Sequence, residues 1–285
     1  SKIWPSINFC DNSHSNDISE FQIFEINFRN KCGKVRRDTP LYFFCINICK
    51  GEIIMRIEHL ELTDSTNEVL KRKRHKQEYD IVYADNQTAS KGRRGNKWIS
   101  DKGAALFSFL VKDNDYGEKT SLLVGYAVYK ILDGILESDK LTFKWPNDIH
   151  YNGRKISGIL IEKCEDFLIV GIGINVNNTD FGVYGETALS LKLITGKEYD
   201  VKNIIVKTVE ETKQRLEKIA EEWETVIDFL NEKHSLNNKL VENNQKEQYE
   251  VIKINYDGSL KVKKDGEKNY TDIYSDEIKG IKIKN

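Results

Sequence analysis

The stretch from residue 141 to residue 176 constrains the fold of this chain more than any other part of its sequence. Leu141–Trp145 is a strand-like run that a proline ends. An Asn-Gly pair at 152–153 marks a tight turn between two further strand-like runs, 149–151 and 155–163. The apolar run 167–176 has the composition of another buried strand. These segments predict a β-hairpin and a neighbouring strand within a larger sheet.

Helices and further strands are expected on both sides of this stretch. Ser65 followed by Glu68 is a capping box, and it predicts a helix that continues to about Lys76. A second helix, capped by Thr120 or Ser121, is expected to carry apolar residues at helical spacing as far as Ile135. The apolar stripe within residues 203–231 predicts one long helix. Additional strands are predicted over 55–62, 80–84 and 104–111.

The C-terminal part of the chain has a different pattern. Short alternating segments around 249–255 and 259–263, joined at Asp257-Gly258, predict a small β-barrel. We place a domain boundary near residue 235, so that residues 55–234 and 235–285 form two domains.

Residues 1–54 differ from the rest of the chain. The sole methionine is Met55, and four of the five cysteines precede it, whereas every motif described below follows it. The runs 21–28 and 41–48 could each be a strand, and no helix-turn-helix pattern is evident. We treat residues 1–54 as an N-terminal extension that is either translated from upstream of a natural start at Met55, the favoured interpretation, or an accessory segment.

Composition narrows the class of protein. The 285 residues carry 44 lysines and arginines against 45 aspartates and glutamates, a net charge of −1, which argues against a strongly basic nucleic-acid binder. No apolar run approaches the roughly 20 residues that span a bilayer, and no signal peptide is recognisable. The five cysteines lack disulfide-like spacing, which fits a reducing compartment. We therefore expect a cytoplasmic protein with no membrane partner.

The first segment with chemical content is the basic, glycine-containing loop from Gln87 to Trp98. Glycines let a backbone approach a ligand closely, and arginines pair with phosphate or carboxylate oxygens. The tryptophan that ends the loop could stack on a flat base. A site for an anionic nucleotide and a solvated basic loop that could also contact nucleic acid are both consistent with this composition.

The second segment is the hairpin, with Lys144-Trp145-Pro146-Asn147-Asp148 on one side. Asp148 could hold a magnesium ion, because that ion prefers carboxylate oxygens and water. Lys155 and Gly158, on the returning strand, should point to opposite faces unless a bulge intervenes. An exposed hairpin with charged edges is the alternative.

The third segment, Gly171-Ile172-Gly173-Ile174-Asn175, places two glycines on one face of an apolar strand. A ring could lie in the flat groove that they leave. The third glycine of a dinucleotide fingerprint is missing, and the sequence contains no GxxxxGK[ST] phosphate loop.

Taken in order, these segments resemble the motifs of the biotin–protein ligase family. The resemblance rests on Asp64–Asn67, on Gln87 with Gly92–Gly95 and Trp98, on Lys144–Asp148, on Lys155–Glu162 and on Gly171–Asn175. It extends from about Met55 to the C-terminus. It implies an α/β (α+β) catalytic domain built on a mixed sheet, with a small SH3-like β-barrel at the C-terminus.

The same resemblance implies a function and its residues. The enzyme would use magnesium-ATP to convert biotin to biotinyl-5′-AMP, and would then transfer biotin to a lysine of a carrier, commonly the biotin carboxyl carrier protein of acetyl-CoA carboxylase. The implied biotin-binding residues are Ser65, Thr66, Gln87, Lys155, Gly158, Gly171 and Gly173. The implied nucleotide-binding residues are Arg93, Arg94, Trp98, Asn147 and Asn175. Lys155 and Arg93 are the expected catalytic residues, and Asp148 would help to position magnesium.

Three positions depart from the usual loop of the family. Ser90 and Lys91 stand where the family has Gly-Arg, and Asn96 stands where it has a further arginine. Lysine keeps the charge but loses the bidentate geometry of arginine. We expect a competent enzyme that retains its adenylate less tightly.

Two other functions are weighed beside this one. A lipoate or octanoate ligase shares the family fold, although the setting of Lys155 favours biotin. A DNA-binding biotin sensor would need a helix-turn-helix in residues 1–54. The basic run Lys71–Arg74 is interpreted as a solvated helix end rather than a nucleic-acid site. Both monomers and homodimers occur in the family.

Overall fold

A computed structural model describes residues 23–26, 43–46, 55–95, 98, 102–113, 115–242, 246–275 and 282–283. Its main body is a nine-stranded mixed sheet in the order β1-β2-β3-β4-β5-β9-β8-β7-β6. The pairing of β3 with β4 is parallel, and the other described pairs are antiparallel. The strands are β1 Ile23–Ile26, β2 Phe43–Ile46, β3 Met55–Thr63, β4 Ile81–Gln87, β5 Ala105–Lys112, β6 Leu141–Lys144, β7 Asp148–Tyr151, β8 Arg154–Cys164 and β9 Phe167–Ile174.

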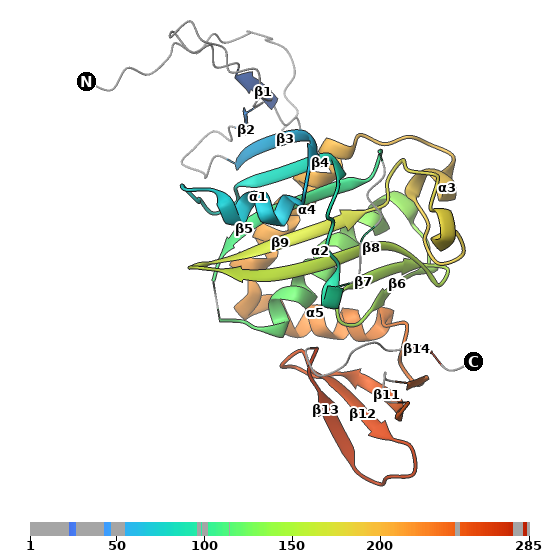
Figure 1. The fold of residues 1–285 in the computed structure, drawn as a ribbon. Coiled ribbons are helices and arrows are strands. Elements are labelled where there is room, and N and C mark those ends of the chain that lie inside the picture. Colours follow the sequence, from blue (N-terminus) through green and yellow to red (C-terminus); the bar gives the residue numbers. More distant parts are fainter. Residues whose placement is uncertain are drawn as a thin grey trace, which may run out of the picture.

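Helices cover the two faces of this sheet unequally (Figure 1). Three long helices, α2 Glu118–Leu136, α4 Val201–Glu217 and α5 Ile219–Lys233, pack on one face and bury the main apolar core. The short helix α1, Thr66–Arg72, packs on the other face, where Leu70 meets Val82, Leu110 and Ile169. The short elements η1 Arg93–Gly95, η2 Gly182–Tyr184 and α3 Leu191–Thr195 lie in connections. Because α1 is only seven residues long, part of the second face is left free for a ligand.

The predicted strands are confirmed to within a few residues, but three helix predictions are wrong in detail. Helix α1 ends at Arg72 rather than near Lys76, and α2 begins at Glu118 after Gly117 rather than at a Thr120 or Ser121 cap. The long helix expected over 203–231 is two helices, because the backbone of Lys218 leaves helical geometry at φ −107° and ψ 11°.

The apolar stripe nevertheless continues through that break. Val209 of α4 and Trp223 of α5 belong to the same buried core. Apolar periodicity reports which face is buried, and it does not report whether the backbone continues as one helix.

A separate five-stranded antiparallel sheet forms the C-terminal part, in the order β13-β12-β11-β10-β14. Its strands are β10 Leu240–Glu242, β11 Gln248–Ile254, β12 Leu260–Lys264, β13 Tyr270–Ile273 and β14 Lys282–Ile283. The small all-β unit that the sequence predicts is therefore present. The exact boundary near residue 235 stays a prediction.

The turn between β11 and β12 docks this sheet onto the main body. Trp145 donates its indole N–H to the carbonyl of Gly258 at 3.0 Å, and Trp223 donates to the carbonyl of Tyr256 at 2.7 Å. Gly258 has φ +95°, and a Cβ there would lie 2.8 Å from Cβ of Glu118. Only glycine fits this close approach without strain.

The N-terminal predictions are met where the chain is described. Strands β1 and β2 lie inside the runs 21–28 and 41–48, and β2 pairs with β3. The remainder of residues 1–54 lies outside the described ranges, so the role predicted for this extension stays a prediction. Among the helices that are described, none is both long and apolar enough to cross a membrane.

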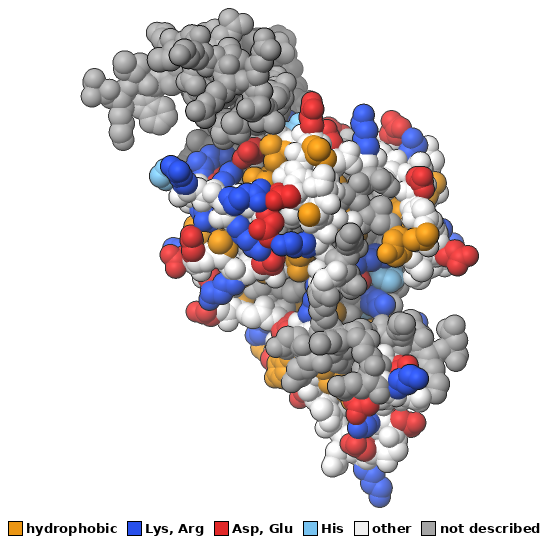
Figure 2. Space-filling model, viewed as in Figure 1, with side chains coloured by type: hydrophobic (Ala, Val, Ile, Leu, Met, Phe, Trp, Pro, Cys, Tyr) orange, Lys and Arg blue, Asp and Glu red, His pale blue; other side chains and the backbone are white. Residues whose placement is uncertain are grey.

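The basic run at the end of α1 is paired with carboxylates rather than free in solvent. Positive and negative side chains alternate over this surface (Figure 2). Arg72 binds Asp64 at 2.6 Å, Lys73 lies 3.1 Å from Glu58, and Lys71 bonds to both Glu68 and Glu162. Three of the four cationic side chains of Lys71–Arg74 are thus paired within the chain, and the interpretation of this run as a solvated helix end rather than a nucleic-acid site stays a prediction.

Candidate active site

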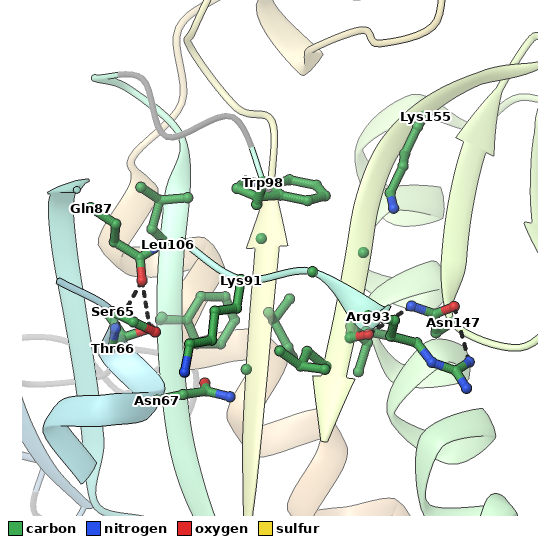
Figure 3. A pocket seen from close by; sticks show the side chains of 18 residues that line it. Ser65, Thr66, Asn67, Gln87, Lys91, Arg93, Trp98, Leu106, Asn147 and Lys155 are labelled. Carbon is green, nitrogen blue, oxygen red and sulfur yellow. Dashed lines mark hydrogen bonds between the residues drawn. The ribbon is translucent and has the colours of Figure 1, made fainter. Parts of the chain in front are cut away.

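The candidate site lies on the face of the sheet beside the N-terminus of α1, over strands β5, β9 and β8. A cavity opens there. The predicted residues that line it are Ser65, Thr66, Gln87, Arg93, Trp98, Asn147, Lys155, Gly158, Gly171 and Gly173. These residues come from six separate elements and loops of the chain. Figure 3 shows their side chains converging on this space.

Two glycines keep the floor of the cavity flat. Gly171 and Gly173 alternate along β9 with Ile172, whose side chain is buried in the core behind the sheet. A Cβ on Gly171 would collide with Oδ1 of Asn67, and one on Gly173 would lie 2.6 Å from Cζ2 of Trp98. The groove inferred from the sequence is confirmed, and in this structure the side chains of Asn67 and Trp98 lie in it.

One end of the cavity is lined by a polar network. The backbone N–H of Thr66 donates to Oε1 of Gln87 at 2.8 Å. The Thr66 hydroxyl lies 2.6 Å from that of Ser108, which in turn donates to Oδ1 of Asn67. The Thr66 hydroxyl also lies 3.4 Å from Oε1 of Gln87, so its one proton has two possible acceptors, Gln87 and Ser108. Ligand atoms would meet polar groups that are already oriented.

The capping box predicted at this helix is not formed. Ser65 is the N-cap of α1, but its side chain makes no capping hydrogen bond. Glu68 instead bonds to the ammonium groups of Lys91 and Lys71, at 2.6 and 3.0 Å. A carboxylate gains more from two cations than from one backbone N–H. The hydroxyl of Ser65 is thereby left to the cavity.

A β-bulge decides where Lys155 points. His150 pairs with Lys155 and Ile149 pairs with Ser157, so Ile156 is an extra residue in β8. One extra residue reverses the face to which the next side chain points. The result is that Nζ of Lys155 lies 2.8 Å from where a Cβ of Gly158 would be. The sequence argument allowed for this exception, and the structure shows it.

Lys155 lies between two cavities. A second cavity adjoins the first, and Trp98 and Lys155 line both. Asp148 and Asn175, both predicted site residues, lie in the second cavity. The other residues of its lining are Lys144, His150, Tyr184, Thr187 and Ala188.

Asp148 is held as a carboxylate. Burial alone would raise the pKa of Asp148, but Lys155 at 2.6 Å and the nearby His150 lower it to about 2. Within the described residues, no group of three or more acidic, His or Cys side chains could hold a metal by itself. A magnesium ion would fit here only as a partner of ligand phosphates with Asp148 as its carboxylate, which is a common arrangement for that ion.

Arg93 links the basic loop to two other parts of the chain. It donates to the carbonyl of Ser275 at 2.7 Å and lies 3.5 Å from Oδ1 of Asn147. Asn147 in turn donates to the carbonyl of Ile159 at 2.7 Å. The side chain of Arg94 and the whole of Asn96 lie outside the described residues, so their predicted roles are not tested.

The structure adds residues that the sequence argument did not place in the site. Asn67 and Lys91 line the first cavity, and Lys144 lines the second. Asn67 follows Ser65 and Thr66 directly, and this adjacency to predicted ligand-binding residues was a usable signal. Ser108 had no such signal, because its role depends on the packing of α1 against β5.

Comparison with known proteins shows what this fold and site are similar to. The sequence model of the biotin/lipoate A/B protein ligase family matches residues 59–177, so this part of the chain is similar to that family. Within it, this chain is similar to the biotin protein ligases. The biotin protein ligase of Aquifex aeolicus in complex with biotin and ATP superposes with a TM-score of 0.73 at 29% identity, covering 80% of this chain and 99% of that one.

Curated relatives agree over shorter spans. The bifunctional ligase/repressor BirA of Escherichia coli strain K12 is 30% identical over 192 residues, which cover 60% of this chain and 59% of that protein. The biotin–[acetyl-CoA-carboxylase] ligase of Mycobacterium tuberculosis is 32% identical over 103 residues, 34% of this chain and 39% of that protein. The chain thus matches less than two thirds of the length of these relatives.

Proposed function

We propose that this chain is an ATP-dependent biotin–protein ligase that works in the cytosol. It would join biotin and ATP to form biotinyl-5′-AMP and pyrophosphate, and would then pass biotin to a lysine of a biotin carboxyl carrier domain with release of AMP. The observation that carries this proposal is the pair of adjoining cavities that share Trp98 and Lys155. Two ligands held in these cavities would meet at Lys155.

The first cavity suits biotin. Its inner end offers the hydroxyl of Ser65 and the oriented groups around Thr66 and Gln87, which match the hydrogen-bonding edge of a ureido ring. The flat floor at Gly171 and Gly173 accepts a fused ring system. The Aquifex relative is described in complex with biotin and ATP, which supports the same two ligands here.

The chemistry of adenylation requires a cation where the two ligands meet. A carboxylate and an α-phosphate repel each other, and a positive charge between them offsets that repulsion. Lys155 occupies that position, and Arg93 can contribute once it leaves Ser275. A carboxylate oxygen of biotin then bonds to the α-phosphorus as the bond to pyrophosphate breaks. Magnesium, when bound with ATP beside Asp148, would supply further charge to the phosphates.

The second step needs the activated intermediate to be shielded from water. The amine of the carrier lysine attacks the acyl carbon of the mixed anhydride, and AMP leaves. Ser90 donates to the carbonyl of Trp98 at 2.5 Å, and Lys91 binds Glu68, so both ends of the loop are attached over the first cavity. A loop that covers a reactive intermediate in this way excludes water.

Lipoate is the alternative substrate, because the matched family includes lipoate ligases. The biotin–[acetyl-CoA-carboxylase] ligase of Mycobacterium tuberculosis, named above, favours biotin. A DNA-binding repressor is less favoured, since the described parts of residues 1–54 are the strands β1 and β2. A homodimer is compatible with the proposal and is not required by it.

The proposal is tested by mass spectrometry of a biotin carrier domain incubated with the enzyme, magnesium-ATP, and biotin or lipoate. We expect an ATP-dependent biotinyl group on the carrier lysine, and a loss of at least about 100-fold in rate for Lys155→Ala. Lys197→Ala is the matched control, because Lys197 is exposed and lines neither cavity. Transfer of lipoate instead of biotin would reject biotin as the substrate.

A further inference from the structure

Lys144 is the one lysine of the Lys144–Asp148 motif, and its ammonium group is not in direct contact with any carboxylate of the described residues. Its side chain makes no hydrogen bond or ion pair in the part of the chain that the structure describes. Other lysines of the main body, such as Lys71, Lys73 and Lys76, are paired with carboxylates. Lys144 instead lines the second cavity.

The carboxylate nearest to Lys144 along the sheet is engaged elsewhere. Lys144 and Asp148 are directly opposite each other in the β6–β7 ladder, where cross-strand side chains normally meet. Asp148 nevertheless binds Lys155 at 2.6 Å, and its other oxygen lies 4.0 Å from Nε2 of His150. The bulge at Ile156 that re-aims Lys155 is therefore also what leaves Lys144 unpaired.

The second cavity consequently carries an excess of positive charge. Lys144 and Lys155 contribute two positive charges to its lining, and Asp148 contributes one negative charge. Burial lowers the pKa of the Lys144 ammonium, and the attraction of Asp148 opposes that change. Removing a cation partly from water costs free energy unless an anion pairs with it. The polyanionic phosphate chain of a nucleotide is the anion that the adjoining cavities require.

We propose that Lys144 binds the phosphate chain of ATP, on the side that departs as pyrophosphate. This inference rests on the proposed function, because it assumes that the second cavity takes the nucleotide. It assigns different tasks to the two lysines of the cavity. Lys155 contacts both ligands where the two cavities adjoin. Lys144 contacts the nucleotide alone and does not bind biotin or the finished adenylate.

The test compares Lys144→Met and Lys144→Arg with wild type in three separate measurements. These are biotin binding without nucleotide, biotin-dependent exchange of radiolabelled pyrophosphate into ATP, and single-turnover transfer from chemically synthesised biotinyl-5′-AMP to a carrier domain. Lys140→Met is the matched control, since Lys140 is an exposed lysine four residues before Lys144.

For Lys144→Met we expect the KM for ATP in the exchange reaction to rise about 10- to 100-fold, the usual effect of losing a charge-assisted hydrogen bond. Biotin affinity and transfer from supplied adenylate should stay within about twofold of wild type. Lys144→Arg should recover most of the ATP affinity. An unchanged KM for ATP in Lys144→Met, or equal losses in biotin binding and transfer, would overturn the assignment.

Thermal unfolding separates a binding role from a structural one. Replacing an unpaired, partly buried charge with an apolar side chain of similar length should leave the Tm unchanged or raise it. A clear fall in the Tm of Lys144→Met, with parallel loss of all three activities, would show a structural role and overturn the proposal.

The outcome for Lys144 can be told apart from failure of the proposed function. If wild type transfers neither biotin nor lipoate, the proposed function fails. Direct titration with a non-hydrolysable ATP analogue then decides the role of Lys144. Weaker binding by Lys144→Met alone would support the assignment, and equal binding by wild type and Lys144→Met would reject it.

Discussion

His234 makes the stability of this protein depend on pH in a predictable window. Its ring is buried where the main body meets the C-terminal sheet, and Nε2 accepts a hydrogen bond from the backbone N–H of Trp145 at 3.2 Å. Nδ1 lies 2.8 Å from Oδ1 of Asn237. Because Nε2 must accept, the proton of the neutral ring is on Nδ1 and is donated to Asn237. Burial lowers the pKa of His234 from 6.5 to about 4.

The direction of the effect follows from the two protonation states. Between pH 6.5 and pH 4 the unfolded chain binds a proton at His234 that the folded chain does not. Stability is therefore fully present above about pH 7, falls as the pH drops through 6.5, and stops falling below about pH 4. At pH 4.5 the loss amounts to about 2.5 kcal/mol, since each pKa unit corresponds to about 1.4 kcal/mol.

Asp148 does not obscure this window. The folded pKa of Asp148 is about 2 and its ordinary value is 3.8. Its stabilising contribution is present above pH 3.8 and is lost as the pH falls towards 2. Burial raises the pKa of Glu210, so that carboxyl changes stability in the direction opposite to His234. The effect of His234 is therefore obtained from the difference between wild type and a variant that does not titrate at position 234.

The assay is urea unfolding followed by tryptophan fluorescence at pH 7.5, 6.5, 5.5 and 4.5. His234→Gln is the control, because a glutamine oxygen can accept from Trp145 and does not titrate. We expect the free energy of unfolding of wild type to fall by about 2.5 kcal/mol across the window relative to that of the glutamine variant. Parallel pH profiles for the two proteins, or an NMR titration of His234 with a midpoint near 6.5, would refute the reasoning.

Two further predictions concern the first cavity. Gly173→Ala should displace Trp98, a residue at the end of the basic loop, and so weaken ATP and adenylate binding about 10-fold with little change in Tm. Gly171→Ala should instead lower the unfolding free energy by about 1–3 kcal/mol. The reason is that Asn67, which the new Cβ would meet, is held in place by Ser108 and Glu162. Calorimetric titration and urea unfolding of both variants check the contrast, and equal effects in the two would contradict it. Lys91→Ala breaks the contact with Glu68 at 2.6 Å and should speed adenylate dissociation about 2- to 5-fold, as a surface ion pair of at most about 1 kcal/mol allows. An Asn96→Arg variant that releases adenylate no more slowly than wild type would count against the expected effect of the loop departures.

The local part of this structure could be predicted from the sequence. Alternation of apolar residues located the strands, and the glycines at 171 and 173 indicated a flat groove because both lie on one face of a strand. Most predicted site residues that are described line one of the two cavities. These features depend on neighbours within a few positions along the chain.

The local rules failed where distant charges competed with them. Ser65 and Glu68 have the spacing of a capping box, but Lys91 lies 23 positions from Glu68 and takes its carboxylate. Trp145 belongs to a motif of the site, yet its indole donates to Gly258, 113 positions away, and so attaches the C-terminal sheet. A tertiary contact of this kind produces no periodic pattern of residues in the sequence.

The sequence by itself determined the elements, the flat groove and the set of residues that make the site, because these follow from the side-chain period of a strand and from short motifs. Only the tertiary structure decided which charged side chains of the site form ion pairs with one another. The bulge at Ile156 turns Lys155 towards Asp148 and the cavity floor, and it leaves Lys144 without an ion pair among the described residues. A bulge depends on how β7 and β8 pair, and strand pairing is set by packing across the whole sheet rather than by either strand alone.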